Sequence, residues 1–517
     1  MPKLVVLGLE LGDGRLLRRW AADGRLPAVQ SLLDEGCWGW LETTADHLHI
    51  SAWPSLYTGV GPGEHGVYFT FQPAPGLQGY QRFHEGLYGR PTFWAMLDRA
   101  GRRCAVLDPP YSHPEAGYGG TFVHDWGTWA HYLKPGSVPP QFLRRLEAAC
   151  GRYPLGAEAN DLGFTPIAAD DIEPRLVAAI TSKARAINWV MDQTAADVVF
   201  AVFGETHVAG HYCWTPEASR EGPASHATSM FRVYRALDRA IGEIRAHAGA
   251  DCAVVLVSGD SVGANHGAWP MLPEILSRLG YLGLPGEGAG SPDASDGPRR
   301  FDPVKALRDL LPKEFRKNLA RKLPTALRDK LAQRVDTADI DWGRTRAFCL
   351  PTDLEGYIRV NLRGREPAGC VEPGAEYEAV LADLEAALLE LRDADTGAAV
   401  VREVWRIDRE CPGDKRDFLP DLVVRWVGER QHGRVTSERV GVVEVESPDR
   451  RTGTHQGPGF VLGAGPGIPR SSTFEGGHIY DFAPTVLARM GVAAPPHLRG
   501  RAWPEFIKDQ QMGSEPR

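Results

Sequence analysis

The sequence predicts an α/β fold with a mostly parallel sheet and helices on both faces. Short apolar runs, which have the length of buried strands, alternate along the chain with longer amphipathic stretches. Strands that alternate with helices usually pair in parallel. Polar residues also follow three of the apolar runs directly, as they do at the carboxyl edge of such sheets. The 517 residues are 43% hydrophobic and 24% charged, which is sufficient for a large core.

The first predicted element is a strand over residues 3–9, and two helices follow over residues 15–22 and 27–36. Short apolar runs predict further strands over residues 104–107, 197–203, 252–257, 422–426 and 459–462. Apolar residues that recur with a helical period predict helices over residues 172–192, 229–247, 272–279, 375–392 and 481–490.

Two stretches are predicted to be insertions in a single domain that spans residues 1–510. Residues 69–162 are rich in Gly, Pro and aromatic residues, which indicates a lid or wall. Residues 284–342 begin as a linker and continue as a basic segment that three prolines divide into short helices. We expect a basic helical cap there. Its leucines recur every four residues, and this apolar face could serve a homo-oligomer contact.

The composition excludes several classes of protein. No apolar run approaches the ~20 residues that span a bilayer, so we expect no transmembrane segment, and the N-terminus lacks a signal-peptide cleavage region. The eight cysteines form no CxxC pair, which favours free thiols and a cytoplasmic protein. The net charge of −8 argues against nucleic-acid binding and is compatible with a small anionic, phosphorylated substrate.

Three histidines are candidate metal ligands. His207 and His211 are four residues apart, a spacing that places both imidazoles on one face of a helical turn. His455 lies in a glycine-rich turn before an apolar run. From spacing alone, an ordinary hydrogen-bonded pair explains His207 and His211 equally well. Residues 46–59 place polar groups before an expected helix, where an anion or an ordinary helix cap would fit.

Six sequence blocks follow one another along roughly residues 3–500. They are Leu7-Gly8-Leu9-Glu10, Ser51-Ala52-Trp53-Pro54-Ser55-Leu56-Tyr57-Thr58-Gly59, Glu205-Thr206-His207 with His211 and Trp214, Ser258-Gly259-Asp260, Gly453-Thr454-His455 and Asp481-Phe482-Ala483-Pro484-Thr485. In this order they resemble the type I phosphodiesterase/nucleotide pyrophosphatase family of the alkaline phosphatase superfamily. The resemblance implies an alkaline-phosphatase-like domain, two divalent metal ions, usually zinc, and a covalent phospho-enzyme formed on Thr or Ser.

The resemblance places His207, His211 and His455 on ligands of the first metal. It places Glu10, and with it Asp260, near the second metal, where both side chains can still ligate zinc.

The chain departs from the family at five positions. The family has Asp where this chain has Glu10, His207 and Gly259, and it has His where this chain has Asp260. Gly259 supplies no ligand, so the second metal site is weakened. The usual Thr or Ser nucleophile falls at His49, which cannot form the usual alkoxide.

Three interpretations of His49 remain open. It could replace a metal ligand, which we favour; it could accept a phosphoryl group or transfer protons; or Ser51, two residues on, could serve as the nucleophile. With three histidines on one ion, the metal could also activate water directly, with Glu10, Asp260 or His49 positioning that water.

The resemblance therefore implies a metal-dependent hydrolase of a phosphoester or phosphodiester bond. The ligands favour one or two zinc ions, and manganese or iron also suits them. Two alternatives stay open: the scaffold could perform another metal-assisted reaction in a specialised pathway, or it could be a non-catalytic metal-binding protein.

Overall fold

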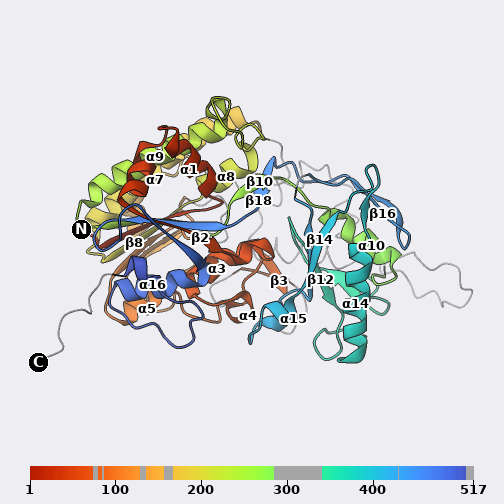
Figure 1. Ribbon diagram of the computed structural model, residues 1–517. Helices are drawn as coiled ribbons and strands as arrows, with labels where there is room; N and C mark the ends of the chain where they lie inside the picture. The colour runs from red at the N-terminus through yellow and green to blue at the C-terminus, as the bar shows by residue number, and fades with distance from the viewer. Residues whose placement is uncertain are drawn as a thin grey trace, which may run out of the picture.

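The computed structural model describes residues 1–73, 80–83, 87–127, 135–155, 167–283, 340–428 and 430–507, and its centre is a nine-stranded sheet (Figure 1). The strand order is β20-β2-β19-β9-β1-β8-β5-β6-β7. The strands are β1 (Leu4–Leu9), β2 (Gly36–Glu42), β5 (Cys104–Leu107), β6 (Thr121–His124), β7 (Gly136–Val138), β8 (Val198–Phe203), β9 (Ala253–Ser258), β19 (Gly459–Ala464) and β20 (Ser472–His478). Only β19 and β7 run antiparallel to their neighbours, so the predicted mostly parallel α/β sheet is confirmed.

Helices cover both faces of this sheet because alternate side chains of each strand point to opposite sides. Val5, Leu7 and Leu9 of β1 belong to one hydrophobic cluster, whereas Leu4 and Val6 belong to another. The first face carries α1 (Gly14–Ala22), α2 (Pro27–Glu35), α6 (Phe142–Cys150), α7 (Ala169–Gln193) and α9 (Ser229–Ala248). The second carries α3 (Ala52–Thr58), α5 (Phe93–Arg99) and α16 (Phe482–Arg489), on the lower side in Figure 1.

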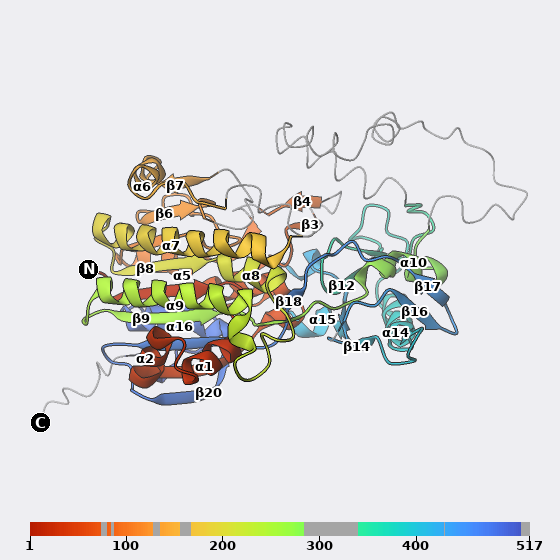
Figure 2. The same ribbon diagram turned by 90° about the horizontal axis from the view of Figure 1, so that it is seen from above.

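A second, smaller lobe lies beyond the carboxyl ends of the parallel strands (Figure 2). Its four-stranded antiparallel sheet has the order β11-β12-β15-β14 and a hydrophobic cluster of its own. Its main elements are α10 (Leu272–Arg278), β11 (Ala347–Cys349), β12 (Gly356–Val360), α14 (Ala375–Leu389), β14 (Val401–Arg406), α15 (Ile407–Glu410), β15 (Leu422–Trp426), β16 (Arg434–Ser437) and β17 (Gly441–Glu444). The strand predicted over residues 422–426 is β15, and it belongs to this second sheet.

Short elements connect the two lobes near the ends of the parallel strands. They are the turn η2 (His49–Ser51), helix α4 (Pro62–His65), helix α8 (Glu205–Tyr212) and a two-stranded ribbon of β10 (Val262–Ala264) and β18 (Gly453–His455). A second ribbon pairs β3 (Phe71–Pro73) with β4 (Tyr80–Arg82).

The range 69–162, expected to form a lid or wall, supplies the last three strands at one side of the central sheet, β5, β6 and the edge strand β7, as well as the β3–β4 ribbon. Most of the expected basic cap, residues 284–339, lies outside the described residues. The division into one domain with two insertions therefore stays a prediction. Among the described helices, none is both long and apolar enough to cross a membrane.

Gly8 allows α3 to pack closely against β1 near the turn that carries His49. A Cβ atom at Gly8 would lie 2.8 Å from Trp53 Cη2 and 2.9 Å from Val202 Cγ2. Both distances are shorter than van der Waals contact, so any side chain here would push Trp53 away from the sheet.

We expect Gly8→Ala to lower the free energy of unfolding by about 1–3 kcal/mol, because an added methyl group overpacks this contact. Urea denaturation followed by tryptophan fluorescence measures the change. Gly433→Ala is the matched control, since a Cβ atom at Gly433 meets nothing within 4 Å. Equal midpoints for the two variants would contradict the packing argument.

Candidate active site

The candidate site lies where β1, β8 and β9 end and the second lobe begins. Glu10 directly follows β1, Asp260 lies two residues beyond β9, and α8, which follows β8, carries His207 and His211. His455 ends β18, whose pairing with β10 brings it over the same strand ends. The parallel register of β1 with β8 and β9 aligns these ends, so residues about 450 positions apart in the chain meet here.

The three predicted histidines form one cluster. One ligating atom from each of His207, His211 and His455 lies within 4.8 Å of the other two. The ring centroids of His207 and His211 are 4.4 Å apart, and that of His455 lies 5.1 and 5.3 Å from them. The i, i+4 spacing on α8 therefore places His207 and His211 side by side, as expected, and the β10–β18 ribbon supplies the third ring.

Each of these histidines directs its Nδ1 atom toward an oxygen. The contacts are His207 Nδ1 to Glu10 Oε1 at 3.2 Å, His211 Nδ1 to Gly453 O at 2.8 Å and His455 Nδ1 to Asp260 Oδ2 at 2.5 Å. In His211 and His455 the Nδ1–H donates a hydrogen bond to that oxygen, which fixes the tautomer and leaves Nε2 as the ligating atom. Metal-binding histidines commonly have this arrangement.

The protonation of His207 and His211 also suits a metal ion. Burial, reinforced by the neighbouring rings and Arg451, holds the pKa of His207 and of His211 well below the usual value of 6.5. Neutral imidazoles are the form that ligates a metal. The three residues therefore fit a divalent ion that accepts nitrogen ligands, such as zinc.

Glu10 and Asp260, predicted as metal ligands, lie beside this cluster and face its histidines. Within the residues that the structure describes, they belong to no second group of three converging ligands. Gly259 lies against α3, where a Cβ atom would be 3.0 Å from Ala52 Cβ, and it supplies no side chain. The geometry therefore brings together one group of three residues that could hold an ion, namely His207, His211 and His455.

His49 lies between two carboxylates. Its Nδ1 atom is 3.0 Å from Glu355 Oε2, and its Nε2 atom is 3.2 Å from Asp353 Oδ1. Although burial opposes the charged ring, Glu355 and Asp353 raise the pKa of His49 to about 10. The ring centroid lies 4.9 Å from that of His455. The two carboxylates thus favour the imidazolium form of His49, which has no free lone pair for a metal.

Ser51, the alternative nucleophile, is turned away from the cluster. Its hydroxyl is buried and lies 2.6 Å from the carbonyl oxygen of Leu48 and 2.7 Å from Thr44 Oγ1. It does not line the cavity that the histidines enclose. The geometry therefore gives no support to Ser51 as a nucleophile.

The second lobe supplies three charged residues that sequence reasoning missed. Asp353 and Glu355 lie in the loop between β11 and β12, and Arg451 precedes β18. The side chain of Arg451 is 7% exposed, with Nη1 3.0 Å from Asp353 Oδ2 and Nη2 2.7 Å from Asp449 Oδ2. Their signals in the sequence were an acidic pair two residues apart and an Arg two residues before the Gly-Thr-His block.

These groups surround a cavity of about 120 Å³, roughly the volume of four water molecules. The three histidines, His49 and Arg451 line it together with the carboxylates of Glu10, Asp260 and Asp353. Aromatic side chains of Trp53, Phe69 and Tyr111 complete the wall. The cavity combines three histidines that could hold a metal ion with two basic side chains and three carboxylates, which suits a phosphoryl group and an attacking water.

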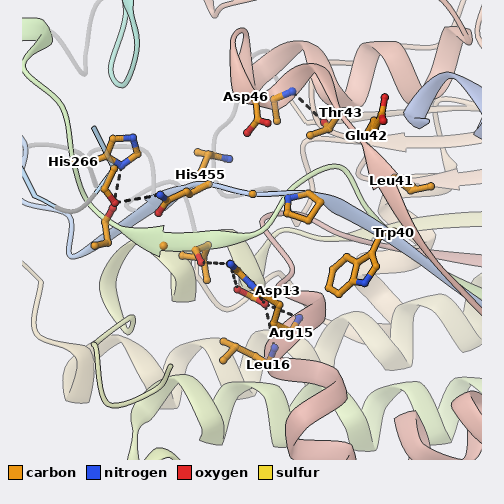
Figure 3. Close-up of a pocket in the computed structure, with 18 of the residues that line it drawn as sticks. Asp13, Arg15, Leu16, Trp40, Leu41, Glu42, Thr43, Asp46, His266 and His455 are labelled. Atoms are coloured by element: carbon orange, nitrogen blue, oxygen red, sulfur yellow. Dashed lines mark hydrogen bonds and ion pairs between the residues drawn. The ribbon is translucent and has the colours of Figure 1, made fainter. Parts of the chain in front are cut away.

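A larger cleft of about 1020 Å³ adjoins this cavity and shares His455 with it. Figure 3 shows His455 with His266 on one side and the ion pair of Arg15 and Asp13 below. Side chains of both lobes line the cleft, including Trp40 from the central sheet and Trp426 from the second lobe. A substrate much larger than phosphate can therefore approach the histidines.

We expect Asp260→Asn to weaken binding of zinc by about 10- to 100-fold, because His455 loses the carboxylate that orients its ring. Competition with a chelating dye measures the affinity. Glu42→Gln serves as control, since Glu42 is an exposed carboxylate of the larger cleft. If both variants bind zinc as the wild type does, Asp260 does not orient His455.

The chain matches one known protein family. The family model described as type I phosphodiesterase / nucleotide pyrophosphatase matches residues 4–271. That range contains Glu10, His49, His207, His211 and Asp260, whereas His455 lies outside it. No protein among those with curated functions matches the chain.

Two solved structures illustrate the likeness. Phosphonoacetate hydrolase from Sinorhizobium meliloti 1021, in complex with phosphonoacetate, is 14% identical, with a TM-score of 0.50 over 93% of this chain and 94% of that one. Murine ectonucleotide pyrophosphatase / phosphodiesterase 5, in complex with AMP, is 13% identical, with a TM-score of 0.48 over 96% and 97% of the two chains. The first of these supports a shared fold.

Proposed function

This chain belongs to the type I phosphodiesterase / nucleotide pyrophosphatase family, whose members are metal-dependent phosphoester hydrolases. On that premise we propose that it hydrolyses a phosphoester or phosphodiester bond at a single metal ion. The observation that carries this proposal is the cluster of His207, His211 and His455, in which each Nδ1 atom lies within 3.2 Å of an oxygen. Zinc is the ion that this nitrogen set favours, and manganese or iron(II) also fits.

The three histidines would hold the ion through their Nε2 atoms. A divalent ion held there supplies a Lewis acid that stabilises charge on the phosphoryl oxygens and lowers the pKa of a water molecule. A single ion is proposed because the positions of the family's second site have changed. Gly259 offers no ligand, and His49 is occupied by Asp353 and Glu355.

Positive side chains take up part of the role that a second ion would have. His49 and Arg451 both line the small cavity, and Asp353 contacts both. Fixed cations beside a bound phosphoryl group stabilise the charge that grows on it during attack. Asp449 holds Arg451 in place, and Glu355 holds His49 in place.

We propose His49 as the general acid. The family's alkoxide nucleophile is absent, so water attacks phosphorus and the bond to the leaving oxygen breaks. The water loses its proton to a neighbouring carboxylate, Glu10 or Asp260. The leaving oxygen takes the place of Asp353 Oδ1 beside His49 Nε2 and receives the Nε2 proton. This assignment replaces the ligand interpretation that the sequence favoured, because both ring nitrogens face carboxylate oxygens.

The test is an assay of chelated protein reconstituted with zinc or manganese. Bis(p-nitrophenyl) phosphate, p-nitrophenyl phosphate and dinucleoside pyrophosphates represent the three bond types. We expect metal-dependent release from at least one of them, which chelation abolishes and added metal restores. Protein that binds metal and hydrolyses none of them would contradict the proposal. It would favour a different metal-assisted reaction on the same scaffold.

A further inference from the structure

A second group of ligating side chains converges outside the active site. His124 ends β6, Asp125 follows it, and His113 lies in the segment between β5 and β6. His124 Nδ1 is 3.5 Å from Asp125 Oδ2, and His113 Nε2 is 3.9 Å from the same oxygen. The two ring centroids are 4.4 Å apart, and one ligating atom of each residue lies within 4.8 Å of the others.

We propose that His113, His124 and Asp125 bind a divalent transition-metal ion, independently of the active site. Ligand atoms at about 2.0–2.2 Å from a tetrahedral ion are about 3.4 Å apart, so the three side chains would draw closer together on binding. Two imidazoles and one carboxylate form a donor set for zinc, cobalt, nickel or iron(II). Calcium and magnesium prefer oxygen ligands.

The burial of the group also suits an ion. The side chains of His113, His124 and Asp125 are 10%, 15% and 4% exposed. Water can therefore reach the group and complete the coordination, while most of each side chain stays packed. None of the three lines either of the two cavities of the active site.

The neighbouring backbone orients the ligands. A Cβ atom at Gly136 would lie 2.6 Å from His124 Nε2, so the His124 ring lies directly on the backbone of β7 and its Nδ1 faces Asp125. Asp125 has a φ of 55°, a left-handed conformation that non-glycine residues adopt rarely. Asp108 accepts hydrogen bonds from the backbone N–H groups of Trp126 and Gly127 and so anchors the chain just after Asp125.

An ion at this place would join two segments that reach toward the active site. His113 lies two residues after Tyr111, which lines the catalytic cavity. Gly127, two residues after Asp125, accepts a hydrogen bond from the buried Lys183. The ion would therefore stabilise the edge of the sheet and would take no part in the hydrolysis.

The experiment is metal analysis of full-length protein that has been loaded with zinc and dialysed. We expect about two zinc ions in the wild type, about one in His124→Ala, about one in His211→Ala and none in the double variant. Cobalt(II) loaded into His211→Ala should give visible absorption bands that are lost when His124 is also replaced. Activity separates the two sites: His124→Ala should keep kcat/KM within about threefold, whereas His211→Ala should lose it.

His247→Ala is the matched control, since His247 forms an exposed pair with Asp192 and should leave the zinc content unchanged. Circular dichroism shows whether each variant is folded. If folded His211→Ala holds no zinc and gives no cobalt bands, the second site does not exist, and the proposed active site is unaffected. Unchanged zinc in His124→Ala would overturn the proposal in the same way.

Discussion

His211→Ala should lose its active-site metal ion and at least about 10³-fold in kcat/KM. His211 supplies one of three imidazoles. Its Nδ1 atom is already hydrogen-bonded to Gly453 O, so only its Nε2 atom is left to bind a metal ion. A metal ion that stabilises a phosphoryl group contributes several kcal/mol to the transition state, and about 4 kcal/mol corresponds to 10³-fold. Zinc analysis and diester hydrolysis, measured on the same preparation, test both parts of this expectation.

His226→Ala is a suitable control for this variant. His226 pairs with Asp23 on the surface of the central domain and lines neither of the two active-site cavities. It should keep full activity and its metal. A His211→Ala protein that is folded and still hydrolyses diesters at the wild-type rate would show that the cluster is not the reaction centre.

His49→Ala should keep its metal but lose about 10²- to 10⁴-fold in kcat/KM. The expected size is that of a general acid, and the cation beside the phosphoryl group is lost as well. A general acid matters most when the leaving group is poor. The loss should therefore be larger for an alkyl phosphodiester than for bis(p-nitrophenyl) phosphate.

The metal content of His49→Ala decides between two roles. If zinc is lost with the imidazole, His49 is a ligand, as the sequence alone favoured. If zinc stays and the loss in rate is the same for good and poor leaving groups, His49 acts only as a fixed charge. Asp353→Asn, which leaves the ring in place but removes the charge beside its Nε2 atom, should give a smaller loss than His49→Ala.

Much of the fold could be predicted because long periodic segments determine their own secondary structure. The helix expected over residues 229–247 is α9, and the strand expected over residues 197–203 is β8. Strand β2 was missed because Gly36–Glu42, which contains two glycines and two tryptophans, shows no alternation of apolar and polar residues. For β15 the apolar run revealed a strand, but only the tertiary structure shows that it belongs to the second sheet.

The histidine cluster could be found from the sequence because His207 and His211 are one helical turn apart and His455 lies in a recognisable block. The partners of His49 could not be found. Glu355 is 306 residues away in the chain, and it reaches His49 only because the second lobe packs over the strand ends. No local pattern records such a contact, yet it decides whether the imidazole is a ligand or a cation.

The most direct test of the single-ion centre is anomalous diffraction at the zinc absorption edge from crystals grown with zinc. The account predicts a peak bonded to the Nε2 atoms of His207, His211 and His455, with no peak bonded to His49. A peak that includes His49 among its ligands, or no peak within reach of the three histidines, would contradict it.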